Sequence, residues 1–411
     1  MDSIIFFIFY TMLVLFTIYT IKRKKIISNY VLIFNIWWLF WLLISFLNLG
    51  NFYAIDLKTY LYIYAGLFSF NITILIRKKN SSKEYNYVKP YLLTILLVIE
   101  IVYLFINIFY FYKMSNTVNM FEEYWKVRFV YFGIPIDNIT ITLFNTSISG
   151  HIYNAFKMFN LINFLISLTE LESKNSKRFI LVVVNMFLFS LFSAGREFIN
   201  YIIIVSIYAF KKKLISKYFK FILIMCLVVL MMTYLREGSL SKVYMALITY
   251  FSGSISYFDY LMKVDDGIRY TGELLLSSVI APAKMVLRFL GVSIGNSGMS
   301  DVGMKLMKMV KLSDTNSFTN YYNALATSFY WQFKDFGLAG IIGINFSIGL
   351  LYNYLYRTIK GDYGIVLFSY LEFLMILSIF SFKFMDLYSV FPIILIILLI
   401  KYNGETMKDI K

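Results

Sequence analysis

Repeated apolar runs of about 20 residues constrain this chain more than any other feature. A helix needs roughly 20 apolar residues to cross the hydrocarbon core of a bilayer, and a helix satisfies its own backbone polar groups there. Hydrophobic residues make up 60% of the 411 residues, a share that excludes an ordinary soluble domain. The sequence therefore predicts an all-α, polytopic membrane protein.

Eleven runs are predicted to cross the membrane. In chain order they are about 4–21, 27–49, 61–76, 91–111, 147–168, 179–191, 198–210, 221–235, 336–356, 363–380 and 387–400. The first run is expected to be a span and not a signal peptide, because Met1, Asp2 and Ser3 carry no positive side chain and the run is too long.

Residues 236–330 break the pattern, since they contain two shorter semi-apolar pieces at 243–262 and 274–290. We expect a single integral membrane domain over residues 1–411, with 236–330 forming one large extracytoplasmic loop inserted in it. The two pieces are predicted to be interfacial or re-entrant helices. If both pieces span, the number of transmembrane helices rises from eleven to thirteen.

The basic residues give an orientation. The net charge of +16 is carried mainly by short segments between the runs, which favours contact with lipid over nucleic acid. Cytoplasmic loops are enriched in Lys and Arg, so the N-terminus is predicted outside. The segments predicted inside are 22–25, 77–89, 174–178, 211–220, 357–360 and the tail from 401.

The sequence FSLFSAGREF at 189–198 lies between two runs that both fit the membrane only if the chain reverses near Gly195. Gly195 suits a sharp reversal because it has no Cβ. Arg196 and Glu197 are then predicted at the tip of a helical hairpin on the outer face, where a guanidinium matches phosphate geometry. Glu197 has two open interpretations, a functional carboxylate or a neutralising partner of Arg196.

Further polar residues lie in the segments that are predicted on the outer face. The arginines there are Arg128, Arg236, Arg269 and Arg288, and each could instead reach toward the interface as a snorkelling side chain. Asp259 lies in the aromatic piece Tyr250–Tyr260, which fits either an interfacial belt or a platform for sugars.

Two residue types that each occur once, cysteine and histidine, exclude other kinds of site. Cys226 is the only cysteine, which excludes an intramolecular disulfide, and His151 is the only histidine, which excludes a His-rich metal cluster. No acidic cluster has metal-ligand spacing, so no metal or other cofactor is predicted.

Glu100 is expected to be buried in its span, protonated, and donating a hydrogen bond in a packing role.

The order of these features resembles the O-antigen and capsule polymerase family (Wzy type, oligosaccharide repeat-unit polymerases). Ser193-Ala194-Gly195-Arg196 is similar to that family's small-Gly-Arg turn between two spans, and Tyr250–Tyr260 to the aromatic segment that starts the large outer loop. Asn316–Thr319 and Asp335-Phe336-Gly337-Leu338-Ala339-Gly340 resemble the elements that precede and open the next span.

The resemblance implies an activity. Such enzymes transfer a growing glycan from polyprenyl diphosphate to a hydroxyl of the next lipid-linked repeat unit, at the outer face of the bacterial cytoplasmic membrane. The product would be O-antigen, capsule or exopolysaccharide, with no nucleotide cofactor, and the partners would be the lipid-linked oligosaccharide, the bilayer, a chain-length regulator and a flippase. Arg196 with Arg236 or Arg288 would hold the diphosphate, Arg128 and Arg269 would add substrate contacts, and the base would be Glu197, Asp259 or Asp335.

Three other functions remain open at this point. A flippase for the same lipid-linked oligosaccharide predicts paired broken helices and internal repeats, which the sequence does not display. An O-antigen ligase-like transferase shares the expected fold but uses another acceptor. A scaffold in an envelope assembly complex would not require outer arginines.

Overall fold

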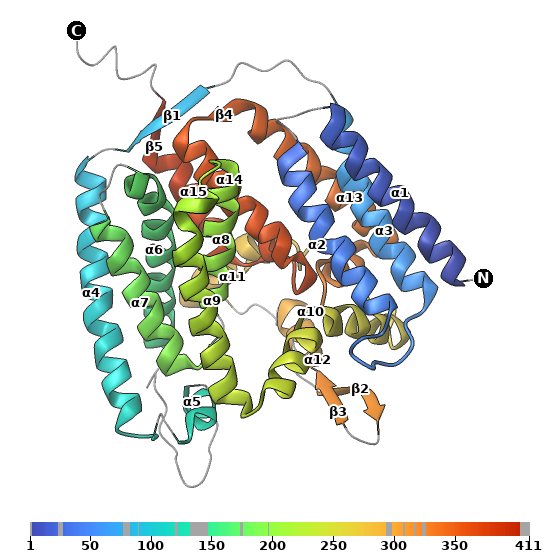
Figure 1. The fold of residues 1–411 in the computed structure, drawn as a ribbon, viewed down its shortest axis with the longest axis horizontal. Coiled ribbons are helices and arrows are strands. Elements are labelled where there is room, and N and C mark those ends of the chain that lie inside the picture. Colours follow the sequence, from blue (N-terminus) through green and yellow to red (C-terminus); the bar gives the residue numbers. More distant parts are fainter. Residues whose placement is uncertain are drawn as a thin grey trace. The chain divides into compact units, whose positions relative to one another are not determined.

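Helices make up most of this computed structural model (Figure 1). It describes residues 2–23, 28–76, 83–88, 90–119, 122–131, 147–172, 176–195, 197–292, 298–306, 309–315, 318–322 and 326–402. The α-helices are α1 (Asp2–Arg23), α2 (Ser28–Phe46), α3 (Leu57–Ile72), α4 (Pro90–Ser115), α5 (Tyr124–Tyr131), α6 (Ser147–Glu172), α7 (Lys177–Ser193), α8 (Phe198–Lys211), α9 (Ile215–Glu237), α10 (Leu240–Lys263), α11 (Ser277–Phe289), α12 (Gly298–Leu306), α13 (Ser328–Thr358), α14 (Asp362–Ile376) and α15 (Leu387–Leu399).

Each of the eleven predicted runs lies largely on a helix, so the helical prediction is confirmed. In the described part of the chain, the helices long and apolar enough to cross a membrane are Asp2–Lys22, Pro90–Ser115, Ile215–Arg236, Ser328–Thr358 and Asp362–Ile379. Shorter apolar helices are Val31–Phe46, Phe198–Lys211 and Leu387–Leu399. These helices support a membrane protein, while the number of crossings stays a prediction.

The two semi-apolar pieces of the predicted outer loop also contain helices, α10 and α11. The structure adds two small sheets that the sequence patterns did not predict. One is the antiparallel hairpin of β2 (Val310–Thr315) and β3 (Phe318–Tyr322). The other has the order β4-β1-β5, from β4 (Ile359–Lys360), β1 (Lys83–Val88) and β5 (Ile400–Tyr402).

The sheet β4-β1-β5 is informative about topology. Its strands come from three segments that the charge pattern places on the same side, and β1 pairs in parallel with β4 and antiparallel with β5. Lys212 adds a fourth such segment, because its Nζ lies 2.5 Å from Asp362 Oδ1. Segments that must share one membrane face in the predicted topology are therefore neighbours in the structure.

The chain divides into two compact units. The first unit comprises Met1–Ser82, Met245–Thr358 and Leu374–Val390, and the second comprises Lys83–Tyr244, Ile359–Phe373 and Phe391–Lys411.

In the first unit, α3 packs along α13, with α1 against α2 and α3 (Figure 1). Two glycines allow α3, and the 3-10 turn Thr73–Leu75 that follows it, to approach α13 closely. A Cβ on Gly66 would lie 2.3 Å from the Phe329 ring, and one on Gly349 would lie 2.5 Å from Thr73 Oγ1. Small residues at helix contacts are how apolar helices pack closely in a bilayer, where no hydrophobic force drives them together.

In the second unit, α4, α6 and α7 pack against one another, and α8 packs against α9 (Figure 1). A polar network holds the first three helices. Glu100 on α4 is fully buried and accepts hydrogen bonds from the amides of Asn160 (2.6 Å), Asn163 (3.0 Å) and Asn185 (2.6 Å). Arg178 donates to Asn163 Oδ1 at 2.9 Å, which links a buried cation to the carboxyl group through one amide.

This network corrects one expectation. Glu100 is buried among the helices as predicted, but its carboxyl group accepts three hydrogen bonds where a single donated one was expected. Asparagine amides from α6 and α7 supply the donors, and their spacing on two other helices could not be recognised from the span that contains Glu100.

Candidate functional site

The turn between α7 and α8 lies at one end of the second unit. α7 ends at Ser193, and Ala194 adopts the left-handed conformation (φ 45°, ψ 33°) with its N–H directed to Leu191 O at 3.4 Å. The backbone N–H of Gly195 donates to Ser193 Oγ at 3.2 Å. The prediction of a reversal here is correct, but the left-handed residue is Ala194 and not Gly195. A Cβ at Gly195 would lie 2.9 Å from Ser193 Oγ, so a larger residue there requires only a shift of that hydroxyl group.

Arg196 lies outside the described residues, so its predicted role stays a prediction. Glu197 follows it and precedes α8. Its carboxylate is paired with Lys157 on α6, at Nζ–O distances of 3.1 and 2.9 Å, and its side chain remains 42% exposed. Lys157 Nζ also lies 4.3 Å from the centroid of the Phe189 ring on α7. Lys157 is therefore a cation beside this turn, and the sequence analysis did not identify it.

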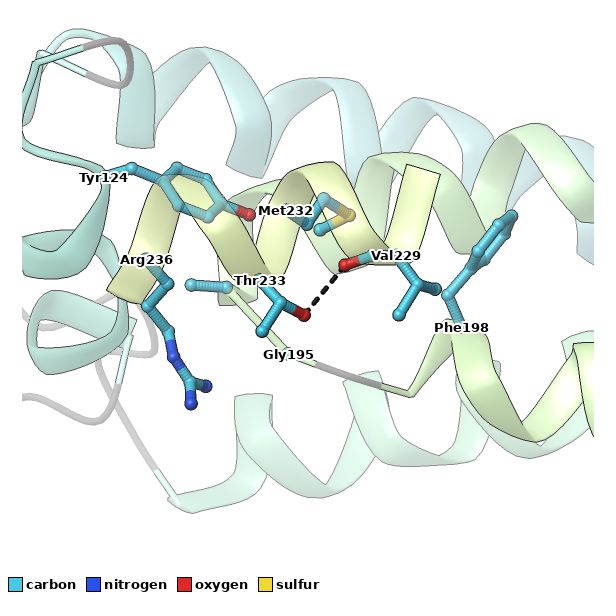
Figure 2. A pocket seen from close by; sticks show the side chains of 8 residues that line it. Tyr124, Gly195, Phe198, Val229, Met232, Thr233 and Arg236 are labelled. Atoms are coloured by element: carbon cyan, nitrogen blue, oxygen red, sulfur yellow. Dashed lines mark hydrogen bonds between the residues drawn. The ribbon is translucent and has the colours of Figure 1, made fainter. Parts of the chain in front are cut away.

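Arg236 lines a small hollow beside the same turn. Figure 2 shows its side chain extending from the last turn of α9, with the guanidinium pointing away from the Tyr124 ring. The hollow has a volume of about 10 Å³, and its lining residues are Tyr124, Ala194, Gly195, Phe198, Val229, Met232, Thr233 and Arg236. Thr233 donates its hydroxyl to Val229 O at 2.8 Å, and Arg236 is the charged residue of the lining.

The electrostatics agree with this placement. Burial raises the pKa of the Tyr124 phenol, and the Arg236 charge opposes the rise. Burial likewise raises the pKa of Tyr131 on α5, with Glu197 adding to the rise and Arg128 opposing it. Arg128 is exposed on α5, which packs against both α7 and α9. The second unit therefore brings Arg236, Arg128 and Glu197 to one end, around the turn that carries Arg196.

Asp335 lies in the first unit and has a different environment. It is 1% exposed, and its two carboxylate oxygens accept the backbone N–H groups of Leu274 (3.3 Å) and Leu275 (2.9 Å). α13 is broken immediately afterwards, at Phe336 and at Gly337, whose φ of 64° and ψ of −148° suit glycine.

The break in α13 leaves backbone carbonyl groups that accept hydrogen bonds from the loop before α11. Tyr270 N–H donates to Lys334 O at 3.0 Å, and Thr271 N–H donates to Asp335 O at 3.3 Å. The Asp335-Phe336-Gly337 sequence thus docks residues 270–275 onto a broken helix. Its carboxylate is occupied by backbone donors, an arrangement typical of a structural capping group.

Arg269 belongs to a charged cluster in the first unit. Its guanidinium binds both carboxylate oxygens of Asp265 (2.9 and 3.3 Å) and lies 4.4 Å from the centroid of the Phe333 ring. The buried Lys334 contacts Asp265 at 3.0 Å and Asp266 at 2.6 Å, and Lys305 contacts Asp266 at 2.5 Å. The sequence analysis missed this cluster, although the adjacent acids Asp265 and Asp266 were a usable signal.

The charged neighbours also set the acidity of the two aspartates. Burial alone would raise the pKa of Asp265, but hydrogen bonds from Arg269 and Lys334 lower it below its ordinary value. Hydrogen bonds from Lys305 and Lys334 lower the pKa of Asp266 well below its ordinary value. Both aspartates are therefore held as carboxylates by their partners.

Asp259 also has internal partners. Its carboxylate accepts hydrogen bonds from Thr59 Oγ1 (2.6 Å) and from the Asp56 N–H (3.0 Å), and it pairs with Lys263 at 2.7 Å. It is 4% exposed, so its contacts join α10 to the start of α3.

Parts of two predicted site elements lie outside the residues that the structure describes. The backbone of Arg288 is on α11, but its side chain lies outside the described side chains, and Asn316 of the Asn-x-x-Thr element lies outside the described residues. Within the described ranges, no group of three or more His, Cys, Asp and Glu side chains is placed to hold a metal ion. No protein-family model, curated protein or solved structure matches the chain.

Proposed function

We propose that the chain is a membrane-embedded glycosyltransferase that joins polyprenyl-diphosphate-linked oligosaccharide repeat units at the outer face of the bacterial cytoplasmic membrane. The observation that carries the proposal is the small hollow beside the α7–α8 turn, which Arg236 lines from the last turn of α9. A guanidinium offers a planar fork of donors to phosphate oxygens and keeps its charge at any physiological pH.

The size of the hollow limits what it binds. The hollow has room for about one water molecule, so a phosphate group would lie over its mouth and not inside it. In the proposed function the diphosphate lies over this mouth, with the polyprenyl chain in lipid and the glycan outside. Arg196 and Arg128 add positive charge from the turn and from α5.

The reaction breaks the bond between the anomeric carbon and the diphosphate oxygen. The acceptor hydroxyl oxygen forms the new bond to that carbon, the diphosphate leaves with the electron pair, and a base receives the hydroxyl proton. Positive groups at the leaving oxygen stabilise the charge that develops there.

Among the three predicted bases, Glu197 fits best. Asp335 is occupied by two backbone N–H groups, and Asp259 is buried against Lys263 and Thr59. Glu197 is more open to solvent and belongs to the same unit as Arg236.

The test is the pattern of lipid-linked glycan in a strain from which the gene is deleted. A polymerase predicts single repeat units on the lipid and on the envelope acceptor, with long chains restored by the wild-type gene. Unmodified long chains held on the lipid would instead indicate a ligase and would contradict the proposal.

A flippase is the second candidate, because Glu100 is an ionisable residue inside a predicted membrane helix. A charged group inside a membrane helix often marks a transport path. However, Glu100 has three amide partners within hydrogen-bonding distance, as expected of a structural network. The same deletion strain separates the two functions, because loss of a flippase leaves repeat units accumulated on the cytoplasmic side.

A further inference from the structure

The first unit contains a second hollow, where the start of α1 meets the segment between α2 and α3. Its volume is about 260 Å³, just below the range of about 300–1,000 Å³ that is typical of sites for small molecules. In the predicted topology this end of the unit is extracytoplasmic, because the N-terminus and residues 49–60 lie outside.

The rim of this hollow is fixed by hydrogen bonds. Asn48 takes the left-handed conformation (φ 52°), its Oδ1 accepts the Phe52 N–H at 2.7 Å, and its Nδ2 donates to Phe52 O at 2.9 Å. The next residue, Tyr53, donates its N–H to Leu312 O of β2 at 2.8 Å. A rim held from two sides loses little conformational freedom when a ligand binds.

The lining combines aromatic faces with hydroxyl groups. Phe46, Tyr53 and Tyr60 contribute rings, and Tyr53 is 54% exposed. The hydroxyls of Ser45 and Tyr60 lie 3.3 Å apart. Sugar rings have an apolar face of C–H groups and an edge of hydroxyl groups, so the two kinds of lining group match the two kinds of sugar surface.

Charge selects among polar ligands. Asp2, in the first turn of α1, lines the hollow, and no Lys or Arg occurs among the described residues that line it. A carboxylate accepts hydrogen bonds from hydroxyl or ammonium groups and repels phosphate and carboxylate. The hollow is therefore suited to a neutral sugar or an amino sugar and unsuited to a phospholipid headgroup or a diphosphate.

We propose that this hollow binds neutral or amino-sugar residues of a glycan, with Tyr53 against the ring face and Asp2, Ser45 and Tyr60 at the hydroxyl edge. The site follows from its own lining and does not require the transferase activity. If the proposed function is also correct, the ligand is the sugar portion of a repeat unit.

The test is binding of the purified full chain, in phosphatidylcholine nanodiscs free of sugar detergents, to an array of neutral, amino-sugar and acidic bacterial glycans. We expect binding to neutral or amino-sugar members, with affinity reduced about tenfold by Tyr53→Ala. Asp2→Asn should weaken amino-sugar binding most. Tyr354→Ala is the matched control, because Tyr354 is 55% exposed on α13 and does not line the hollow.

Three results would overturn the site. They are absence of binding to every glycan, preference for acidic glycans, and equal binding by Tyr53→Ala and Tyr354→Ala. Arg236→Gln separates this site from the proposed function, since it should abolish polymer formation and leave glycan binding unchanged. Glycan binding together with normal polymer in Arg236→Gln would contradict the proposed function alone.

Discussion

Lys157 Nζ lies 2.9 Å from the carboxylate of Glu197, which ties α6 to the residue that precedes α8. The contact puts an ion pair beside the turn that carries Arg196 and next to the hollow of Arg236. Because both side chains are partly exposed, the pair contributes little to stability. Its main effect is to hold a carboxylate in place at the candidate site.

Glu197→Gln tests whether that carboxylate acts as the base. Glutamine keeps the shape and can still accept a hydrogen bond from Lys157, but it cannot take a proton. We expect polymer formation to fall about 10²–10⁴-fold, the usual contribution of a general base, with normal protein abundance. The measurement is glycan polymer length in a complemented deletion strain.

The control is Glu123→Gln. Glu123 pairs with Lys126 at 2.7 Å and is also 42% exposed, so it matches the exposure and partner of Glu197. Equal effects of the two substitutions would remove the assigned role of Glu197.

Asp335→Asn tests the docking of the loop on the broken helix. An amide can replace only one of the two acceptor oxygens and presents an N–H₂ group to the other backbone N–H. We expect a loss of about 1–3 kcal/mol for a buried hydrogen bond left unmade, measured as thermal unfolding in nanodiscs. Asp362→Asn removes an exposed ion pair and should cost less. Unchanged stability of Asp335→Asn would show that the docking contact is dispensable.

Gly337→Ala tests the break itself. Gly337 has a φ of 64° and a ψ of −148°, which an alanine adopts only at a cost of about 1–3 kcal/mol. Gly343 is a matched control on the same helix, because a Cβ there meets no atom within 4 Å and its φ is not positive. Gly343→Ala should leave the unfolding midpoint unchanged or raise it, and an equal fall for both variants would contradict the assigned strain.

The Asp265–Asp266 cluster predicts a dependence on pH. Since both pKa values are lowered in the folded chain, the stabilisation is complete above the ordinary aspartate pKa of about 3.9 and is lost as the pH falls below it. The unfolding midpoint should therefore fall as the pH drops below about 4, and it should continue to fall below pH 3, toward the lowered pKa of Asp266. Asp266→Asn should flatten that fall, and an identical fall in this variant would exclude the cluster as its cause.

Membrane orientation can be tested with single cysteines. In a Cys226→Ser background, Ile215→Cys should be protected from an impermeant label in intact cells, and Ser300→Cys should react with it. The prediction rests on the clustering of Lys and Arg, and the sheet β4-β1-β5 agrees with it by joining three of the predicted inner segments. Labelling at position 215 with none at 300 would invert the assignment.

The helices were predictable because their signal is local. An apolar run indicates a membrane helix from its own residues, and even the break in α13 at Phe336 coincides with the predicted start of a span at 336. The reversal near 195 was predictable for the same reason, from the lengths of two adjacent runs.

The environment of the polar residues was not predictable, because it depends on contacts between distant segments. Asp335 is occupied by Leu274 and Leu275, which are 61 and 60 residues away, and Glu197 by Lys157, which is 40 residues away. No periodicity records such a pairing. The sequence could therefore identify the arginines and acids as candidates but not distinguish the capping role of Asp335 from a catalytic one.

The most direct test of the diphosphate assignment is glycan polymer length, at matched membrane abundance, for Arg236→Lys and Arg196→Lys. Lysine keeps the charge but loses the planar fork of donors. The proposed site predicts a loss of about 10²–10³-fold in polymer formation for each, while Arg357→Lys, on the predicted cytoplasmic side, keeps wild-type polymer. Wild-type polymer length from both Arg236→Lys and Arg196→Lys at normal abundance would contradict diphosphate binding by these guanidinium groups.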